Sequence, residues 1–126
     1  MKEVMAIIRM NMVSRTKQAL ADAGVSSLTA AIAHGRGQGR VDFRILHGAE
    51  QGIEEAIVQL GQGPRLIPKR LLSIVVPDEK VKAVVDTVIR VNRTSQAGDG
   101  KIFVLPTFDS VRIRTGETSD TAINEM

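Results

Sequence analysis

Three short segments of this chain are apolar at consecutive positions, and they limit what it can fold into. They are residues 4–8 (VMAII), 71–76 (LLSIVV) and 102–105 (IFVL). Neighbouring side chains of a strand point to opposite faces of a sheet, so each segment predicts a strand that is apolar on both faces. Both faces of the resulting sheet must therefore be covered.

The first half of the chain predicts a strand, a helix and a strand. Residues 2–9 form an apolar run bounded by charges, and residues 25–33 suggest a second strand. Between them, Asn11 is expected to cap a helix that ends at Gly24, a residue suited to a left-handed cap. The helix is indicated by apolar positions at three- and four-residue spacing: Val13, Thr16, Leu20 and Ala23.

The second half repeats this order after a long stretch, from about His34 to Lys69, that lacks strand character. Leu71 to Val76 predicts a strand, and Pro77-Asp78 begins a helix. Residues 93–100 break this helix. Two further strands are expected, one over 102–105 and a short last one over 111–114. The helix carries one apolar stripe, made of Val81, Val84, Val85, Val88 and Ile89.

Two strand-helix-strand halves in one chain of 126 residues predict a single α+β domain over residues 1–126 with a ferredoxin-like βαββαβ order. A long loop is expected over about residues 35–69. Two helices cover only one face of such a sheet. We therefore expect self-association into a closed cyclic oligomer that buries the other face.

Composition excludes several classes of function. The net charge is +3, but aromatic residues make up only 2% and Tyr and Trp are absent, which argues against nucleic-acid binding. Without cysteine the chain has neither disulfides nor thiolate metal sites. The apolar N-terminal run is too short to span a membrane, so we expect a cytoplasmic protein without a membrane partner.

Three strings of glycines and cations are candidate anion sites. Residues 34–40 (HGRGQGR) combine free amides with Arg36 and Arg40, although a flexible hinge would look the same. Residues 98–101 (GDGK) place an amine beside a turn at a strand start, and a plain tight turn is the alternative. Residues 112–117 (RIRTGE) would put both arginines on one side of a strand, which could equally be a solvated edge.

The segment over residues 94–104, with Thr94 and the string GDGKIFV, resembles the C-terminal signature of the PII nitrogen-regulatory proteins, as does the string over 112–117. The resemblance extends over nearly the whole chain outside residues 51–66. The further matching positions are Ala6-Ile7-Ile8, Gly35 and Gly37, Gly48-Ala49-Glu50, Pro68-Lys69, and Ile74-Val75-Val76-Pro77-Asp78.

The resemblance implies a trimer that binds ATP or ADP in clefts between subunits, and 2-oxoglutarate beside ATP-bound Mg²⁺. The positions matching nucleotide-binding residues are Ile7, Thr29, Gly35, Arg36, Gly37, Gln38, Val75, Gly98, Asp99, Gly100, Lys101, Arg112 and Arg114. Those matching the 2-oxoglutarate site are Gln38, Gly39 and Lys69, with Gln38 as the candidate Mg²⁺ ligand.

Three positions depart from the family pattern. Gln38 falls one position early and Gly39 takes its usual place, which puts the 2-oxoglutarate geometry in question. Gln51 stands where some relatives carry a tyrosine that is uridylylated, so this modification is excluded. Ser73 replaces a glutamate that meets the adenine side.

The insertion within about residues 51–66 indicates a branch of the family. Residues 50–60 place Ile53, Ala56, Ile57 and Leu60 on one helical face, which could pack on its own trimer or enter a partner's groove. The loop is similar to that of the nitrogenase-associated PII proteins. That resemblance implies assembly with a sister PII subunit and inhibition of nitrogenase by direct binding when fixed nitrogen is plentiful. The expected partner-binding positions are Arg40, Glu50, Ile53, Ile57 and Leu60.

We therefore expect a signalling protein rather than an enzyme, as a homotrimer or a mixed assembly. The alternative is a general PII protein that regulates an ammonium transporter or glutamine synthetase. Nucleotide hydrolysis is disfavoured. His34 and His47 are the only histidines and lack an obvious third ligand, and nothing orients Glu50 or Glu54 to activate water.

Overall fold

The computed structural model describes residues 1–36 and 66–123. The chain divides into two units: Met1–Ala33 with Lys69–Met126, and His34–Pro68. The second unit nearly coincides with the loop expected over residues 35–69. Several predicted site residues lie outside the described residues: Gly37, Gln38, Gly39, Arg40, Glu50, Ile53, Ile57 and Leu60.

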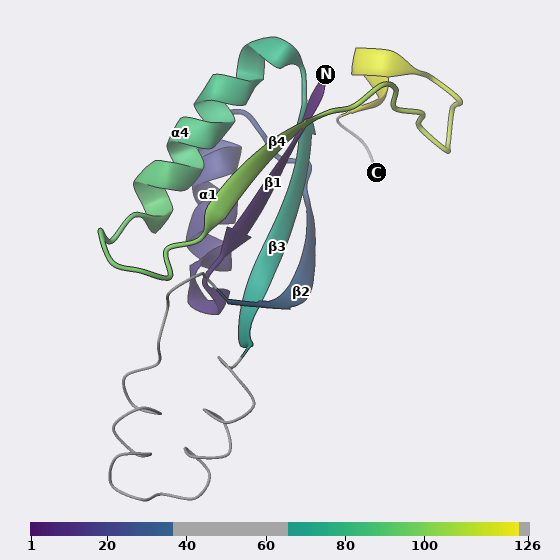
Figure 1. The fold of residues 1–126 in the computed structure, drawn as a ribbon. Helices are drawn as coiled ribbons and strands as arrows, with labels where there is room; N and C mark the ends of the chain where they lie inside the picture. The colour runs from purple at the N-terminus through teal and green to yellow at the C-terminus, as the bar shows by residue number, and fades with distance from the viewer. Residues whose placement is uncertain (37–65, 124–126) are drawn as a thin grey trace, which may run out of the picture. The chain divides into compact units, whose positions relative to one another are not determined.

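The strands form one antiparallel sheet in the order β2-β3-β1-β4 (Figure 1). Strand β1 (Lys2–Ile8) lies in the middle and pairs antiparallel with both β3 (Ile67–Val76) and β4 (Lys101–Pro106). Strand β2 (Thr29–Gly35) is the other edge. With helices α1 and α4 between the strands, this is the predicted ferredoxin-like βαββαβ order.

The starts of two strands differ from the predicted ones by four residues each. Strand β2 begins at Thr29 rather than at residue 25, because Val25 belongs to the end of the preceding helix: its N–H donates to the Leu20 carbonyl oxygen at 2.8 Å, and its side chain is buried in the core. Strand β3 begins at Ile67 rather than Leu71. Ladder pairing with β1 extends to Arg70, so its charged side chain does not end the strand.

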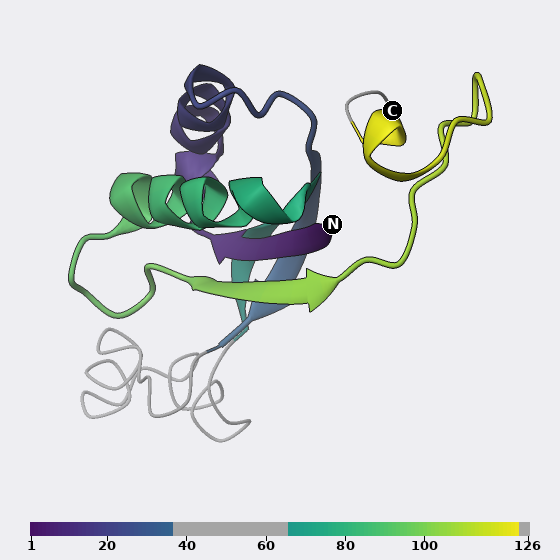
Figure 2. The same ribbon diagram turned by 90° about the horizontal axis from the view of Figure 1, so that it is seen from above.

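Helices α1 (Val13–Asp22) and α4 (Val81–Asn92) lie on the same face of the sheet (Figure 2). The amide of Asn92 links them across the core, donating to the Thr16 hydroxyl at 3.1 Å. The core between helices and sheet consists of Val4, Ala6, Ile8, Leu20, Val25, Leu72, Ile74, Val76, Val84 and Val88.

The predicted start of the first helix was wrong, and its predicted end is confirmed. Asn11 lies inside a 3-10 turn, Met10–Met12, and Met12 rather than Asn11 is the N-cap, without a side-chain capping bond. Because the chain enters α1 through this tighter turn, the capping position falls one residue later. Gly24 adopts φ 86° after the helix, and its N–H donates to the Ala21 carbonyl oxygen.

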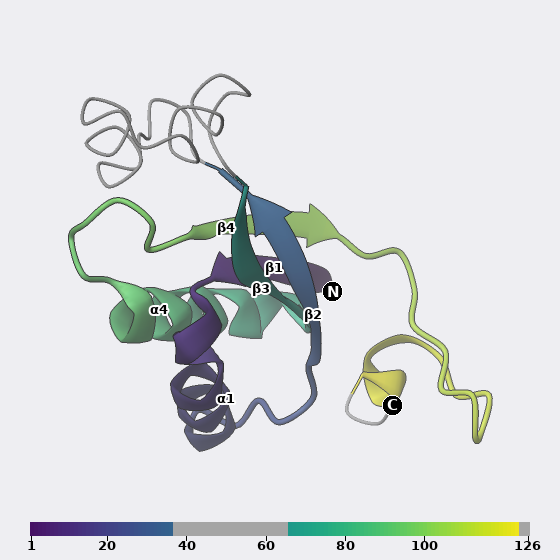
Figure 3. The same ribbon diagram turned by 90° about the horizontal axis from the view of Figure 1, so that it is seen from below.

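Neither α1 nor α4 covers the opposite face of the sheet (Figure 3). The register places Met5 beside Phe103 on this open face, one position away from the buried Ala6 and its partly buried partner Ile102 on the core face. Phe103 is 45% exposed and Leu105 37%. This open face is therefore apolar but uncovered in a single chain, as the consecutive apolar runs predicted.

The predicted last strand over residues 111–114 was wrong. Residues 107–118, called here the C-terminal segment, continue past the end of β4 (Figure 1) and contain only one isolated bridge, Val111 with Thr118. Between these residues the chain turns, with Gly116 at φ 73°. The left-handed conformation that Gly116 allows closes a tight turn, so the alternating pattern of residues 112–114 does not extend into a ladder.

Candidate functional site

The carboxylate of Asp99 organises the loop over residues 93–101. It accepts hydrogen bonds from the backbone N–H of Thr94 at 2.8 Å, from the N–H of Ser95 at 3.1 Å and from the Thr94 hydroxyl. The Arg9 guanidinium donates to the same carboxylate at 2.7 Å. The loop is therefore closed around a single acidic side chain.

These contacts keep Asp99 ionised. The hydrogen bonds from Thr94, and then the Arg9 guanidinium, hold the pKa of the Asp99 carboxyl far below its ordinary value. An ionised carboxylate that faces its own loop is a scaffold for the backbone, and it is poorly suited to meet an anion directly. The motif match predicts Asp99 at a nucleotide site, and in the structure Asp99 is the residue that shapes the loop over residues 93–101.

Gly100 brings the loop against the end of β1. It has φ 118°, and a Cβ atom built at this position would lie 1.9 Å from the Ile7 carbonyl oxygen. Only glycine fits such a close approach of two backbone segments. The loop geometry therefore depends on this residue.

Two lysines lie at the same end of the sheet. Lys101 opens β4 opposite Ile7, and its ammonium lies 5.9 Å from the centre of the Phe103 ring. The buried Lys69 of β3 donates from Nζ to the Gly98 carbonyl oxygen at 2.9 Å. The predicted residues gathered here are Ile7, Lys69, Gly98, Asp99, Gly100 and Lys101, which we call the loop cluster.

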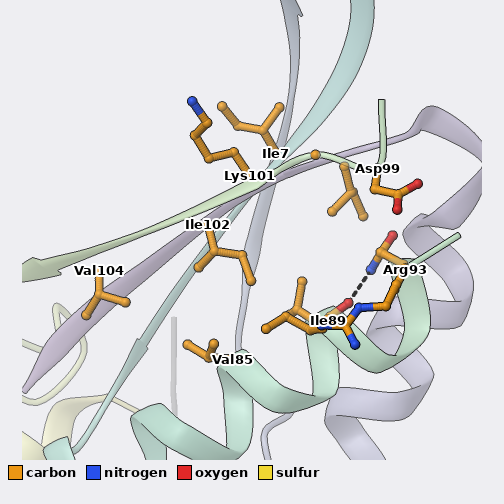
Figure 4. Close-up of a pocket in the computed structure, with 12 residues that line it drawn as sticks. Ile7, Val85, Ile89, Arg93, Asp99, Lys101, Ile102 and Val104 are labelled. Carbon is orange, nitrogen blue, oxygen red and sulfur yellow. Dashed lines mark hydrogen bonds between the residues drawn. The ribbon is translucent and has the colours of Figure 1, made fainter. Parts of the chain in front are cut away.

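An apolar groove of about 430 Å³ adjoins the loop cluster (Figure 4). Val85 and Ile89 of α4 form one wall, and Ile102 and Val104 of β4 form the other. Figure 4 also shows that the Lys101 and Ile102 side chains leave β4 on opposite sides. The Lys101 ammonium therefore points away from the Ile102 side chain, although Lys101 is also among the residues that line the groove.

A second set of predicted residues lies elsewhere in the chain. The predicted residues Thr29, Val75 and Arg112 line a cavity of about 340 Å³ together with other residues of the C-terminal segment and the turn after it. Ser73, which stands in place of a family glutamate, lines the same cavity. We call these four residues the C-terminal cluster. They share no member with the loop cluster or with the groove beside it.

The alternation predicted that the two arginines of the C-terminal segment lie on one side of a strand. In the structure they do not. Arg112 donates to the Glu117 carboxylate at 2.9 Å and to the Thr121 carbonyl oxygen at 2.6 Å. Arg114 lies in the turn that follows. The like-charge repulsion expected from a flat strand is thus avoided in two ways, by the turn and by the carboxylate.

Sequence reasoning missed two side chains that contact residues of these two clusters. Arg9 holds Asp99, and Glu3 accepts a hydrogen bond from the Ser73 hydroxyl at 2.6 Å. The only signal for Arg9 was a charge that ends an apolar strand. For Glu3 it was a carboxylate on the open face of β1. The remaining predicted residues, Gly35 and Arg36, lie at the end of β2 in the other unit.

Among residues 1–36 and 66–123 there is no group of three His, Asp or Glu side chains that could hold a metal ion. In that same part of the chain, every helix is too short or too polar to cross a bilayer.

The family model for nitrogen regulatory protein P-II matches residues 1–117. The chain is 45% identical to the "nitrogen fixation nifHD region GlnB-like protein 2" of Methanobacterium ivanovii, covering 98% of this chain and 99% of that protein. It is 46% identical to the protein of the same name from Methanothermococcus thermolithotrophicus, with 98% of each covered. The nitrogen regulatory protein P-II 1 of Escherichia coli K12 is 37% identical, over 98% of this chain and 100% of that protein.

Among solved structures, Arabidopsis thaliana PII bound to citrate superposes with a TM-score of 0.73 at 29% identity. The match covers 99% of this chain and 90% of that one. The family model matches most of the chain, the relatives match over nearly their full length, and the solved structure shares the fold. All three findings point to the same family. The chain belongs to the P-II family of nitrogen regulatory proteins.

Proposed function

We propose that this protein senses ATP, ADP and 2-oxoglutarate in a trimer and regulates nitrogen fixation by binding nitrogenase. Proteins of the P-II family are signalling regulators rather than enzymes, as the sequence predicted. The observation that carries the proposal is the separation, within one chain, of two clusters that the family motif assigns to one nucleotide.

The separation follows from the register of the sheet. Ile7 pairs with Lys101, whereas Val75 pairs with Glu3, four residues away along β1. At the rise of a strand, these two rows lie about 13 Å apart. A rotation that places copies around an axis brings the loop cluster of one copy near the C-terminal cluster of the next, and so completes a site at each seam.

The open face supports the same assembly. Met5 and Leu71 are half-buried, and Phe103 and Leu105 are more exposed still. Burial of apolar surface contributes roughly 25 cal/mol per Å², so covering this face with two further copies favours association. A mixed trimer with a sister PII subunit would bury it equally well.

The loop cluster supplies the chemistry for phosphate groups. Lys101 contributes a positive charge at the start of β4, and Lys69 a second one beside Gly98. Backbone amides in a glycine-rich turn are suited to anions. Arg112 of a neighbouring copy would bring its guanidinium to the same phosphates, and Lys69 is also the lysine that we propose for 2-oxoglutarate.

Signalling would follow if the effectors bind two states of the loop over about residues 35–69, the proposed regulatory loop, with unequal affinity. ATP, Mg²⁺ and 2-oxoglutarate would favour a state that cannot dock on the target, and ADP one that can. A hundredfold preference between the states corresponds to about 2.7 kcal/mol.

Nitrogenase is the proposed target because relatives at 45–46% identity are named for a nitrogen-fixation region. The second candidate is regulation of an ammonium transporter or glutamine synthetase. The 37% identity to a general P-II protein favours it, and Gln51 in place of a modified tyrosine counts against it. Affinity capture from nitrogen-fixing cells, with ADP present and then with ATP and 2-oxoglutarate, decides between them by whether nitrogenase or one of the other proteins is retained.

The nucleotide site is tested by calorimetric titration of the assembled protein with ATP. We expect Lys101→Ala to weaken ATP binding by about tenfold or more, since it removes a charge-assisted phosphate contact. Lys17→Ala, on the exposed side of α1, is the matched control for loss of charge. Absence of ATP binding at millimolar nucleotide, or equal affinity in Lys101→Ala and Lys17→Ala, would refute the site.

A further inference from the structure

Arg9 connects two segments that are distant in sequence. It follows the last residue of β1 and reaches the loop over residues 93–101. One guanidinium nitrogen lies 2.7 Å from the Asp99 carboxylate, and another lies 3.3 Å from the Ala97 carbonyl oxygen. The Arg9 side chain is 29% exposed and that of Asp99 24%. This partly buried pair anchors the loop to the sheet.

Three further donors of the loop are directed at Asp99. The N–H groups of Thr94 and Ser95 and the Thr94 hydroxyl point to its carboxylate, and the Gln96 N–H donates to the Thr94 hydroxyl oxygen at 3.2 Å. The first half of the loop thus surrounds the carboxylate. The second half is held by Lys69 at the Gly98 carbonyl and by the packing of Gly100 on β1.

The pairing also determines the charge that an anion meets. Lys69 and Lys101 favour an anion, but the ionised Asp99 belongs to the same cluster and would repel it. The Arg9 guanidinium compensates that negative charge at hydrogen-bond distance. With Arg9 in place, the loop cluster keeps its positive character.

We propose that Arg9 is a positioning residue for nucleotide binding: it holds the loop over residues 93–101 in the conformation that receives phosphate groups, and it neutralises Asp99 there. This inference rests on the proposed nucleotide site. Arg9 acts through Asp99 and need not touch the nucleotide itself.

The experiment compares Arg9→Ala, Arg9→Lys and Arg9→Gln in the full-length protein. Arg15→Ala, on the exposed side of α1, is the control for loss of a cation. Calorimetry gives the affinity for ATP. Hydrogen exchange of the nucleotide-free protein gives the protection of the peptide over residues 93–101. Replacing a residue that supports a preorganised site weakens ligand binding by about tenfold or more. We expect a loss of ATP affinity of this size for Arg9→Ala.

Arg9→Lys should recover most of the affinity and Arg9→Gln little, because the lysine retains the charge that compensates Asp99. Exchange over residues 93–101 should accelerate in Arg9→Ala, while α1 and α4 keep wild-type protection. Arg15→Ala should match the wild type in both measurements. If Arg9→Ala does not fold, the comparison of Arg9→Lys with Arg9→Gln carries the test.

Three results would overturn the inference. Wild-type affinity in Arg9→Ala, or equal affinities in Arg9→Lys and Arg9→Gln, would do so while leaving the proposed nucleotide site intact. Unchanged exchange over residues 93–101 in a folded Arg9→Ala would show that Arg9 does not hold the loop. If the wild-type protein itself binds no ATP, the proposed function fails, and this inference fails with it.

Discussion

The loop over residues 93–101 is held by its own chain, whereas the C-terminal segment over residues 107–118 leaves its apolar side chains uncovered. Asp99, Arg9 and Lys69 tie the loop to strands of the sheet. In the C-terminal segment, Phe108 is 98% exposed and Ile113 99%. Both segments carry cations of the family motif, so one half of the proposed site is preorganised in the single chain and the other depends on a second copy.

The two regions should differ most in how much folding stability is lost when their glycines are replaced by alanine. In Gly100→Ala the new Cβ would meet the Ile7 carbonyl, and either the loop or β1 must move. We expect a loss of more than about 2 kcal/mol, or about 8 °C in Tm. In Gly116→Ala, where nothing lies within 4 Å, only the left-handed conformation is penalised, by about 1 kcal/mol.

Thermal unfolding followed by circular dichroism measures both variants. Equal shifts in Tm for the two alanines would mean that the contact of Gly100 with β1 does not restrict the loop.

The exposed apolar residues of the C-terminal segment provide the next test. Within one chain, Phe108→Ser and Ile113→Ser remove almost no buried surface and should change folding stability by less than about 0.5 kcal/mol. If a second copy covers these residues, each change should raise the dissociation constant of the assembly by about tenfold. Sedimentation at several concentrations measures this constant. Ala21→Ser, on the exposed side of α1, is the control. Unchanged assembly in both variants would argue that these residues face solvent in the assembly.

A smaller effect is expected at the ion pair of the C-terminal segment. Glu117 is half exposed, so Glu117→Gln should alter folding stability by no more than about 0.5 kcal/mol. Because the change removes a carboxylate that competes for the Arg112 guanidinium, ATP affinity should rise about threefold. Calorimetry measures the change. A fall in affinity would instead show that Glu117 orients Arg112 toward its ligand.

The smallest expected effect is the absence of a pH response in the loop. The pKa of Asp99 is lowered by Thr94 and Arg9, so its stabilising contribution is complete above its ordinary value of 3.8 and is lost only as pH falls through the lower folded-state pKa. Hydrogen-exchange protection over residues 93–101, corrected for intrinsic rates, should therefore stay constant from about pH 7 to about pH 4.5. Asp99→Asn should reduce protection throughout this range. A decline in the wild type near pH 5 would contradict the lowered pKa.

Much of the fold was readable from sequence because it depends on local periodicity. The apolar runs predicted three strands, and the stripe through Val84 and Val88 predicted α4 with its buried face. The apolar runs also indicated that one sheet face would stay open. Patterns of this kind identify elements reliably when they are long, and β1, β3 and α4 are long.

The short or tertiary features could not be read in this way. Residues 111–114 looked like a strand because alternation over four residues cannot be distinguished from a turn that Gly116 closes. The partnership of Arg9 with Asp99 joins residues 90 positions apart, and periodicity contains no information at that distance. The motif match predicted the site residues, whereas their division into two clusters required the sheet register.

That register has a consequence for tolerance to insertions and deletions. Ile7 faces Lys101, and Ala6 faces Ile102. If β4 slid past β1 by a single position, the ammonium of Lys101 would enter the hydrocarbon core under α4 while Ile102 turned toward water. Adding or removing one residue between Gly100 and Phe103 should therefore abolish folding, whereas replacing a side chain there would not.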